Sequence, residues 1–169
     1  MVSKLIPGYQ LRRGSGIDRA MLVKFMHRTY QELFPEQNFS HLAKTVDRYL
    51  STQTPIWWVE VIDKPATSPI GCLWVGNAID QVEGDRVTHI FLLYVSPPHR
   101  RLGIGAALVT HAENWAKARG DRQIGLQVFV SNQPALNLYQ KLGFQSESVL
   151  MVKSLNYSRE QGTGNREQW

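Results

Sequence analysis

The sequence has 169 residues but a single cysteine, Cys72, which excludes an internal disulfide framework and a cysteine-rich zinc site. It has no apolar run as long as the ~18 residues that a membrane-spanning helix needs. Residues 1–8 include a Pro-Gly pair and no hydrophobic core of a signal peptide. From these absences we expect a soluble, cytoplasmic protein that does not insert into a membrane.

Acidic residues are fewer than basic ones, since 14 Asp and Glu against 19 Lys and Arg give a formal net charge of +5. Such an excess favours an anionic partner, either nucleic acid, a phosphate-bearing cofactor or a membrane surface. The length predicts one domain over residues 1–155, because domains average roughly 150 residues. Residues 156–169 are polar and contain no aliphatic side chain, so we expect a flexible tail there.

The hydrophobic pattern predicts an α/β fold, with one mixed sheet flanked by helices in the order β-α-α-β-β-β-α-β-α-β. Strands linked by hairpins should be antiparallel, and the βαβ unit around Gly103 should be parallel and right-handed. The expected strands are 9–12, 56–62, 70–79, 86–95 and 123–130, with a last one within 144–155. The expected helices lie at about 18–33, 40–50, 103–118 and 133–142.

The segment from Leu93 to Ala106 carries the strongest chemical signal. A strand ends there, two prolines stop it, and Gly103 and Gly105 open an amphipathic helix. A helix N-terminus has unpaired N–H groups and a positive dipole end, and glycines let an anion approach the backbone closely. Five bases and two acids lie within residues 99–122. The segment therefore predicts a pyrophosphate site.

Two familiar phosphate-binding patterns are not met. The P-loop pattern GxxxxGK[ST] is absent, and the pair formed by Gly103 and Gly105 lacks the third glycine of the dinucleotide fingerprint. An alternative is therefore left open, in which the glycines serve only the packing of the helix.

Two motifs together give a resemblance to a known family. Arg100-Arg-Leu-Gly103-Ile-Gly105 resembles motif A, [Q/R]-x-x-G-x-[G/A], of the GCN5-related N-acetyltransferase (GNAT) superfamily. The segment from Asn132 to Phe144 resembles motif B, N-x-x-A-x-x-x-Y-x-x-x-G-F, and meets every fixed position. The resemblance covers about residues 5–155 and is specific over 85–145.

The resemblance implies an acyltransferase that moves an acetyl group directly from acetyl-CoA to a primary amine of a small molecule, peptide or protein. It also implies a V-shaped cleft between the strands that end near Val95 and Val128, in which the pantetheine arm pairs with Leu93 and Val95. The implied acetyl-CoA contacts are Leu93, Tyr94, Val95, Arg100, Arg101, Leu102, Gly103, Ile104, Gly105, Ala106, Asn132 and Tyr139.

The resemblance implies that Tyr139 protonates the departing thiolate. The general base is less clear, because the positions at which relatives carry acids hold Gln127, Phe91 and Leu92. None of these side chains accepts a proton at neutral pH.

His89 is the remaining candidate for the base, since imidazole has an ordinary pKa of ~6.5. Strand alternation predicts that His89, Phe91, Leu93 and Val95 share one side of the strand. A water chain, or an amine that arrives already neutral, is left open.

The acceptor amine is expected beside the first two helices. Aromatic faces and carboxylates suit a cationic amine, and the candidates are Tyr30, Glu32, Phe34, Glu36 and Phe39, with Trp57, Trp58 and Trp74 as further walls. We predict no metal, because His27, His41, His99 and His111 do not cluster with carboxylates, and we expect Cys72 to be an inert core residue.

Two functions of other classes are weighed against the enzyme. One is a non-catalytic acyl-CoA-binding sensor on the same fold. The other is nucleic-acid binding, which the absence of a helix-turn-helix, a zinc finger and an RNP-type strand disfavours, so no nucleic-acid partner is expected. The sequence leaves open whether the chain is a monomer or a homodimer.

Overall fold

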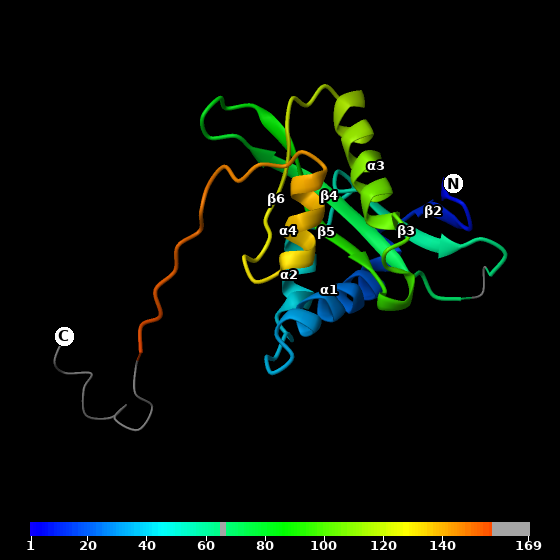
Figure 1. The fold of residues 1–169 in the computed structure, drawn as a ribbon, viewed down its shortest axis with the longest axis horizontal. Coiled ribbons are helices and arrows are strands. Elements are labelled where there is room, and N and C mark those ends of the chain that lie inside the picture. The colour runs from blue at the N-terminus through cyan, green and yellow to red at the C-terminus, as the bar shows by residue number, and fades with distance from the viewer. Residues whose placement is uncertain (65–66, 157–169) are drawn as a thin grey trace.

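The computed structural model describes residues 1–64 and 67–156, and in this part of the chain six strands form one mixed sheet (Figure 1). The strands lie in the order of the sequence, and only β5 and β6 are parallel neighbours. The strands are β1 (Val2–Ile6), β2 (Tyr9–Arg13), β3 (Ile56–Val61), β4 (Gly71–Ile79), β5 (Arg86–Val95) and β6 (Ile124–Leu126). The expected mixed α/β fold is confirmed.

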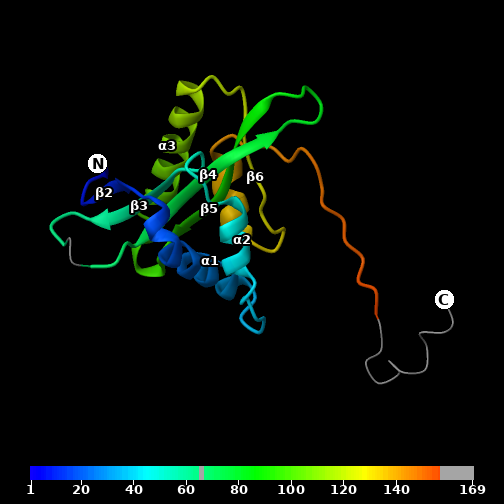
Figure 2. The ribbon, with the colours of Figure 1, turned by 180° about the vertical axis from the view of Figure 1, so that it is seen from behind.

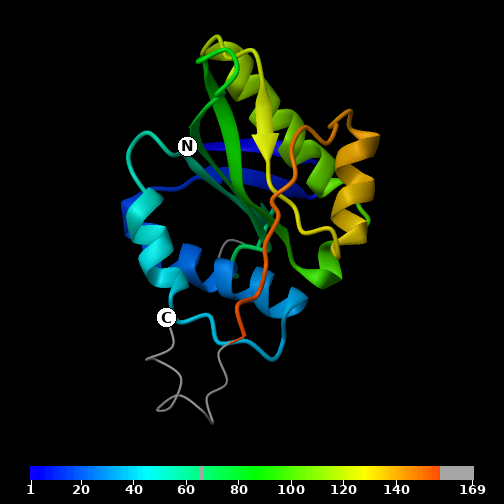
Figure 3. The ribbon, with the colours of Figure 1, turned by 90° about the vertical axis from the view of Figure 1, so that its left-hand side faces the viewer.

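The helices flank this sheet and agree closely with the expected ones. They are α1 (Arg19–Leu33), α2 (Leu42–Tyr49), α3 (Ile104–Ala118) and α4 (Gln133–Lys141), with short 3-10 turns η1 (Gly16–Asp18) and η2 (Pro97–His99). Figure 3 shows α1 and α2 on one side of the sheet and α3 on the other. Gly120, with φ of 86°, ends α3 as expected for a C-terminal cap.

The first strand, β1, was not predicted from the sequence. It pairs antiparallel with β2 through a tight turn in which Gly8 has φ of 88°. Residues 2–4 are exposed, so the segment has no apolar alternation that would reveal a strand.

The sheet separates two hydrophobic cores. On one face α1 and α2 pack on Trp58 and Trp74, which are 0% and 1% exposed. On the other face α3 packs on Leu73 and Val75. Because successive side chains of a strand point to opposite faces, the continuous apolar run of β4 supplies both cores.

A β-bulge interrupts β5. Trp74 pairs with Leu92 and Val75 pairs with Ile90, so Phe91 is an extra residue in β5. The Phe91 ring packs against Trp74 with 4.9 Å between ring centroids, on the face of α1 and α2. The bulge therefore changes which side chains share a face.

This bulge makes one prediction wrong. His89 pairs with Gly76, over which the Phe91 ring lies, and the rings of His89 and Phe91 are 5.2 Å apart. His89 and Phe91 therefore face α1 and α2, whereas Leu93 and Val95 pack in the core of α3. Simple alternation had placed all four on one side.

β5 and β6 diverge after three residue pairs. Pairing is confined to residues 88–90 of β5, which lie beside residues 124–126 of β6. Beyond β6 the chain turns toward α1, where the Phe129 ring packs. The strand expected over 123–130 is therefore too long, because its second half leaves the sheet. In the part of the chain described, the edge of β5 over 91–95 has no strand partner on this side.

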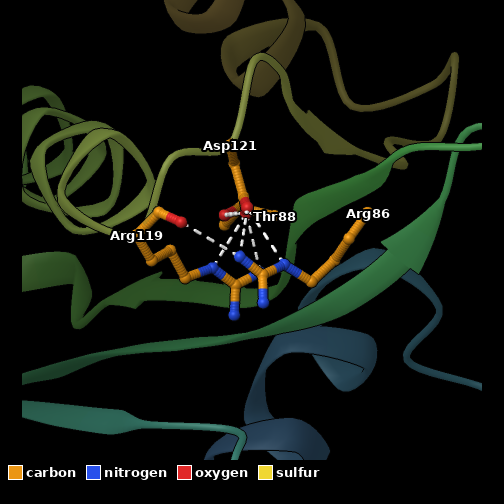
Figure 4. A network of polar contacts seen from close by, with 4 residues as sticks. All are labelled: Arg86, Thr88, Arg119 and Asp121. Atoms are coloured by element: carbon orange, nitrogen blue, oxygen red, sulfur yellow. Dashed lines mark hydrogen bonds and ion pairs between the residues drawn. The ribbon is translucent and has the colours of Figure 1, made fainter.

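A network of polar side chains around the buried Asp121 carboxylate lies where β5 and β6 are still paired (Figure 4). The Asp121 carboxylate, 2% exposed, accepts hydrogen bonds from Thr88 Oγ1 at 2.6 Å, Arg119 Nε at 2.8 Å and Arg86 Nη2 at 2.9 Å. Burial raises the pKa of Asp121, but the hydrogen bonds from these three side chains outweigh it and the pKa is lowered. The network fixes the end of α3 to the start of β5.

Asp121→Ala is expected to lower the free energy of unfolding by about 3 kcal/mol, because it leaves the buried Thr88 and the largely buried Arg119 without their partner. The matched control is Asp85→Ala, since Asp85 lies 3.9 Å from Arg122 in an exposed ion pair. That change should cost less than about 1 kcal/mol. Urea unfolding of the three proteins checks this, and equal losses in the two variants would contradict it.

The same network predicts sensitivity to acid. The pKa of Asp121 is lower in the folded protein than the ~3.9 of an unfolded chain. Its contribution is therefore complete above about pH 4 and is lost as the pH falls through the folded-state pKa. The stability difference between the wild type and Asp121→Asn should shrink below about pH 4, and a constant difference in urea melts would count against the ion pair.

The last expected strand, within 144–155, does not form. Phe144 N–H still donates to the Tyr139 carbonyl at 2.9 Å, but residues 145–156 are exposed and irregular. Figure 2 shows them leaving the body of the protein beyond α4. The flexible tail expected over 156–169 lies, apart from Asn156, outside the described residues.

Candidate functional site

The turn between β5 and α3 contains two residues with positive φ. Gly103, the N-cap of α3, has φ of 89°, and Arg101 has φ of 63°. Glycine adopts this conformation without a Cβ clash. Leu102 at the turn is 55% exposed, whereas Ile104 is 1% exposed and anchors the helix. The turn therefore presents the first N–H groups of α3, which are suited to binding an anion.

Gly105 lies where three elements meet. A Cβ at this position would lie 3.2 Å from Leu138 Cδ2 of α4 and 4.0 Å from Leu93 Cδ2 of β5. The first turn of α3, α4 and the edge of β5 thus meet at Gly105, where a side chain would have to displace Leu138. The structure brings both motifs of the sequence to one place.

The open edge of β5 directs specific backbone groups outward. Ser96 N–H donates to the Ile70 carbonyl at 2.7 Å, continuing the antiparallel pairing of β5 with β4. Because hydrogen-bonding directions alternate along a strand, Tyr94 also faces β4 and the backbone groups of Leu93 and Val95 face the open side. An extended ligand that carries amides can pair with these groups.

Tyr94 and Arg100 are tied to α1 through Glu32. Tyr94 Oη donates to Glu32 Oε1 at 2.6 Å, and Arg100 Nη2 donates to Glu32 Oε2 at 2.7 Å. Burial and the hydrogen bond to Glu32 raise the pKa of Tyr94 to about 12. Arg100 Nε also donates to the Val95 carbonyl at 2.7 Å. Both side chains therefore face α1 rather than the turn before α3.

The positive charge counted from the sequence is not concentrated at this turn. Lys117, Arg119 and Arg122 lie at the opposite end of α3, which is about 20 Å long at ~1.5 Å per residue. Arg119 is held by Asp121. Anion binding at this turn would therefore depend on the α3 N–H groups and Arg101 more than on a basic cluster.

The α4 residues of motif B lie next to the turn. The Asn132 side chain accepts a hydrogen bond from Ala135 N–H at 3.4 Å and caps α4. Tyr139 is half-buried, its ring 5.6 Å from that of Phe144, and burial raises the pKa of its hydroxyl. Tyr139 thus remains a protonated donor at neutral pH.

His89 lies on the α1 and α2 side of β5, near the narrow end of the divergence. Burial lowers its pKa below the ordinary value, so the imidazole is neutral at physiological pH and able to accept a proton. Gln127, the residue at the position of an acid in some relatives, is exposed just beyond β6.

Aromatic rings line the surface between α1 and the segment after β6. Tyr30 packs on Phe39 with ring centroids 5.6 Å apart, and Phe34 packs on Phe129 at 5.0 Å. Phe129 was missed from the sequence, because the residues around it were assigned to a strand. Phe129 follows β6 and packs against Tyr30 and Phe34, so the segment after β6 contacts the end of α1.

The three tryptophans expected to line the acceptor site do not lie there. Trp58 and Trp74 are fully buried in the core of α1 and α2. Trp57 lies on the opposite face, where its ring is 4.6 Å from that of His111 on α3. All three are core residues.

Cys72 is fully buried, and burial raises the pKa of its thiol, so it is an inert core residue as expected. Among the residues that the structure describes, no three His, Cys, Asp or Glu side chains are grouped so that they could hold a metal ion. No described helix is both long and apolar enough to span a membrane.

Residues 21–144 match the family described as "Acetyltransferase (GNAT) family". The chain belongs to this family. The match runs from the start of α1 to Phe144 and includes both motifs recognised in the sequence.

Curated relatives of this GNAT chain match it over shorter segments. It is 38% identical over 79 residues to "Uncharacterized N-acetyltransferase MJ1207" of Methanocaldococcus jannaschii, covering 47% of this chain and 33% of that one. It is 38% identical over 72 residues to "[Ribosomal protein bS18]-alanine N-acetyltransferase" of Escherichia coli K12, covering 43% and 48%. The chain thus spans a third to about half the length of these relatives.

Solved structures share the GNAT fold at low sequence identity. A putative acetyl transferase from Pyrococcus furiosus has a TM-score of 0.68 at 23% identity, covering 86% of this chain and 99% of that one. A predicted acetyltransferase with acetyl-CoA from Clostridium acetobutylicum has a TM-score of 0.69 at 20% identity, covering 86% and 96%.

Proposed function

We propose that this GNAT chain is an N-acetyltransferase that moves an acetyl group from acetyl-CoA to a primary amine. The observation that carries the proposal is the meeting of α3, α4 and the open edge of β5 at Gly105. The absence of a side chain at Gly105 and the N–H groups of the turn before it suit a pyrophosphate that approaches the backbone closely. The outward backbone groups of Leu93 and the N–H of Val95 fit the amide-bearing pantetheine arm, while the Val95 carbonyl is held by Arg100.

Each remaining predicted contact has a place in this proposal. Arg101 to Ala106 would hold the pyrophosphate through their backbone N–H groups. The Asn132 amide nitrogen would donate to the pantetheine arm, because its oxygen already caps α4. Arg100 and Tyr94 would act indirectly, by holding the end of β5 against Glu32.

The chemistry requires proton transfers that the chain's own residues can carry out. Acetyl-CoA supplies the activated thioester. A backbone N–H near Val95 would stabilise the developing oxyanion. Tyr139 would donate its hydroxyl proton to the leaving sulfur, and its raised pKa keeps that proton in place at neutral pH until the thiolate forms.

The acceptor that we favour is the α-amine of a peptide. The support is the aromatic surface of Tyr30, Phe34 and Phe129, which suits the first side chains of a peptide, and the names of relatives. One is the alanine N-acetyltransferase mentioned above, and another is an "N-alpha-acetyltransferase" of Sulfurisphaera tokodaii, 43% identical over 63 residues, covering 37% of this chain and 38% of that one.

The test is a panel of amines with acetyl-CoA and identification of each product by mass. The panel holds peptides with free and blocked N-termini, a lysine side-chain amine, a polyamine and an amino sugar. Acetylation at the free peptide N-terminus alone supports the favoured acceptor. Tight binding of acetyl-CoA without turnover of any amine would favour the non-catalytic sensor instead.

His89 is the proposed general base, acting through water. Six residues of strand at ~3.3 Å each separate it from Val95 by up to about 20 Å, which is too far for direct transfer. The bulge at Phe91 shortens this path and turns His89 toward the acceptor side. Since burial lowers the pKa of His89, kcat/KM should rise with pH through an apparent pKa below about 6.5.

His89→Gln is expected to remove this acidic limb of the pH profile. The matched control is His111→Gln, because burial and the nearby Arg13 also lower the pKa of His111, which packs on Trp57 away from the cleft. The control should keep the limb. Superimposable profiles for the wild type and His89→Gln would assign His89 to packing.

The compartment and the assembly complete the proposal. We propose the cytoplasm because the only cysteine is buried and unpaired. We propose a homodimer because the apolar residues 149–152 are exposed in a single copy. Neither a nucleic acid nor a membrane is part of the proposed function.

A further inference from the structure

Residues 145–156, the C-terminal arm, carry an unusual amount of exposed apolar surface. Val149, Leu150, Met151 and Val152 are 80–87% exposed, and Leu155 is 67% exposed. Figures 1 and 2 show the arm standing away from the rest of the protein. A contiguous apolar patch of this kind marks an interaction site.

The pattern of the arm is that of a strand covered on both faces. In an extended chain Val149 and Met151 point to one face while Leu150 and Val152 point to the other. A strand with one solvated face would alternate apolar and polar residues, so this run requires a sheet neighbour and cover above and below. Among the residues that the structure describes, the arm has neither a neighbouring strand nor a covering layer from its own chain.

β6 offers a complementary unpaired edge. It is the last strand in the order of the sheet, and its one described strand partner is β5. Its residues Ile124 and Leu126 join the core of α3, so a strand added beside β6 would also find apolar cover. An exposed strand edge is a template for pairing with another chain.

We propose that two copies of this chain exchange their C-terminal arms, each arm adding a strand to the β6 edge of the other copy. The arm begins just after Gly143, whose φ of 96° turns the chain, and leads away from its own β6 (Figure 1). Every copy carries one arm and one receiving edge, so reciprocal exchange satisfies both in a closed twofold dimer. An unrelated partner protein would leave either the arm or the β6 edge without a strand neighbour.

The exchange also bears on the site. β6 and the residues after it form the far side of the open edge of β5, and the exchanged strand would lie next to them. Each copy contributes the twelve residues of its arm and the three residues of β6 that receive the other arm, which is fewer than the roughly 20–30 residues per side of a standard interface. The proposed dimer rests on the exposed arm and the edge of β6 rather than on acetyl transfer, so its test needs no activity.

The first experiment measures oligomeric state by sedimentation velocity over a range of concentrations. The full-length wild type should be a dimer, and Met151→Asp should weaken it at least ~100-fold in Kd, because each interface would bury an added charge. The matched control is Val82→Asp, since Val82 is 85% exposed in the turn between β4 and β5. A monomeric wild type, or equal Kd values for the two variants, would overturn the proposal.

The second experiment distinguishes exchange from folding of the arm onto its own chain. A variant with both Gln127→Cys and Met151→Cys is treated with a short bifunctional maleimide, to which the buried Cys72 is not accessible. Exchange predicts covalent dimers and, in addition, cross-links between copies that carry one change each after mixing. Covalent monomers alone, at every concentration, would show that the arm pairs with its own β6.

Discussion

Gly105→Glu is expected to abolish measurable binding of acetyl-CoA. Its Cβ would lie 3.2 Å from Leu138 Cδ2, at the junction between the first turn of α3 and α4. A carboxylate there would occupy the space of the pyrophosphate and repel its charge, in a place where unpaired N–H groups favour an anion. Calorimetric titration of the folded variant with acetyl-CoA checks the result.

Two controls separate the causes of this loss. Gly105→Gln adds the same bulk without the charge and should bind weakly rather than not at all. Gly16→Glu adds the same side chain at a glycine that has no neighbour within 4 Å of a built Cβ, and it should bind normally. Unchanged affinity in a correctly folded Gly105→Glu would remove the pyrophosphate from this turn.

The elements that could be predicted from sequence are those whose signals are local. The turn before α3 and the cap of α4 depend on residues within a few positions of each other, such as Gly103 and Asn132. Helix periodicity likewise located α1, α2 and α3 to within one or two residues. Local signals were therefore sufficient to predict the secondary structure in which both motifs lie and its order along the chain.

The wrong predictions depend on partners far along the chain. The bulge at Phe91 depends on how β5 is paired with β4, and nothing in the β5 sequence itself reveals it. The end of β6 is set by where the chain turns to pack Phe129 against α1. In the same way, an apolar run such as 149–152 predicts a strand but not which chain supplies its neighbour.

The site residues divide in the same manner. Backbone roles, such as those of Gly105 and Val95, follow from the motif and fit the geometry. The side-chain role of Arg100 does not, because Arg100 is engaged by Glu32, which lies 68 positions away. Charge counting failed for a related reason, since residues close in sequence, at the two ends of α3, are about 20 Å apart in space.

Tyr139→Phe is expected to lower kcat by about 10²- to 10⁴-fold with little change in the affinity for acetyl-CoA. The change keeps the ring, which packs against Phe144 at 5.6 Å, and removes the hydroxyl proposed to protonate the leaving sulfur. Loss of a general acid costs a factor of this size. The measurement pairs single-turnover kinetics, which isolate the chemical step, with calorimetric titration of acetyl-CoA.

The control for this prediction is Tyr49→Phe, because Tyr49 lies on α2, is 43% exposed and packs against Phe91. It should keep the wild-type rate. Because burial raises the pKa of Tyr139 above its ordinary ~10, the wild-type rate should also show no falling limb due to this group below about pH 10. Single-turnover rates that are equal in the wild type and Tyr139→Phe would limit Tyr139 to packing and leave the protonation of the thiolate to water.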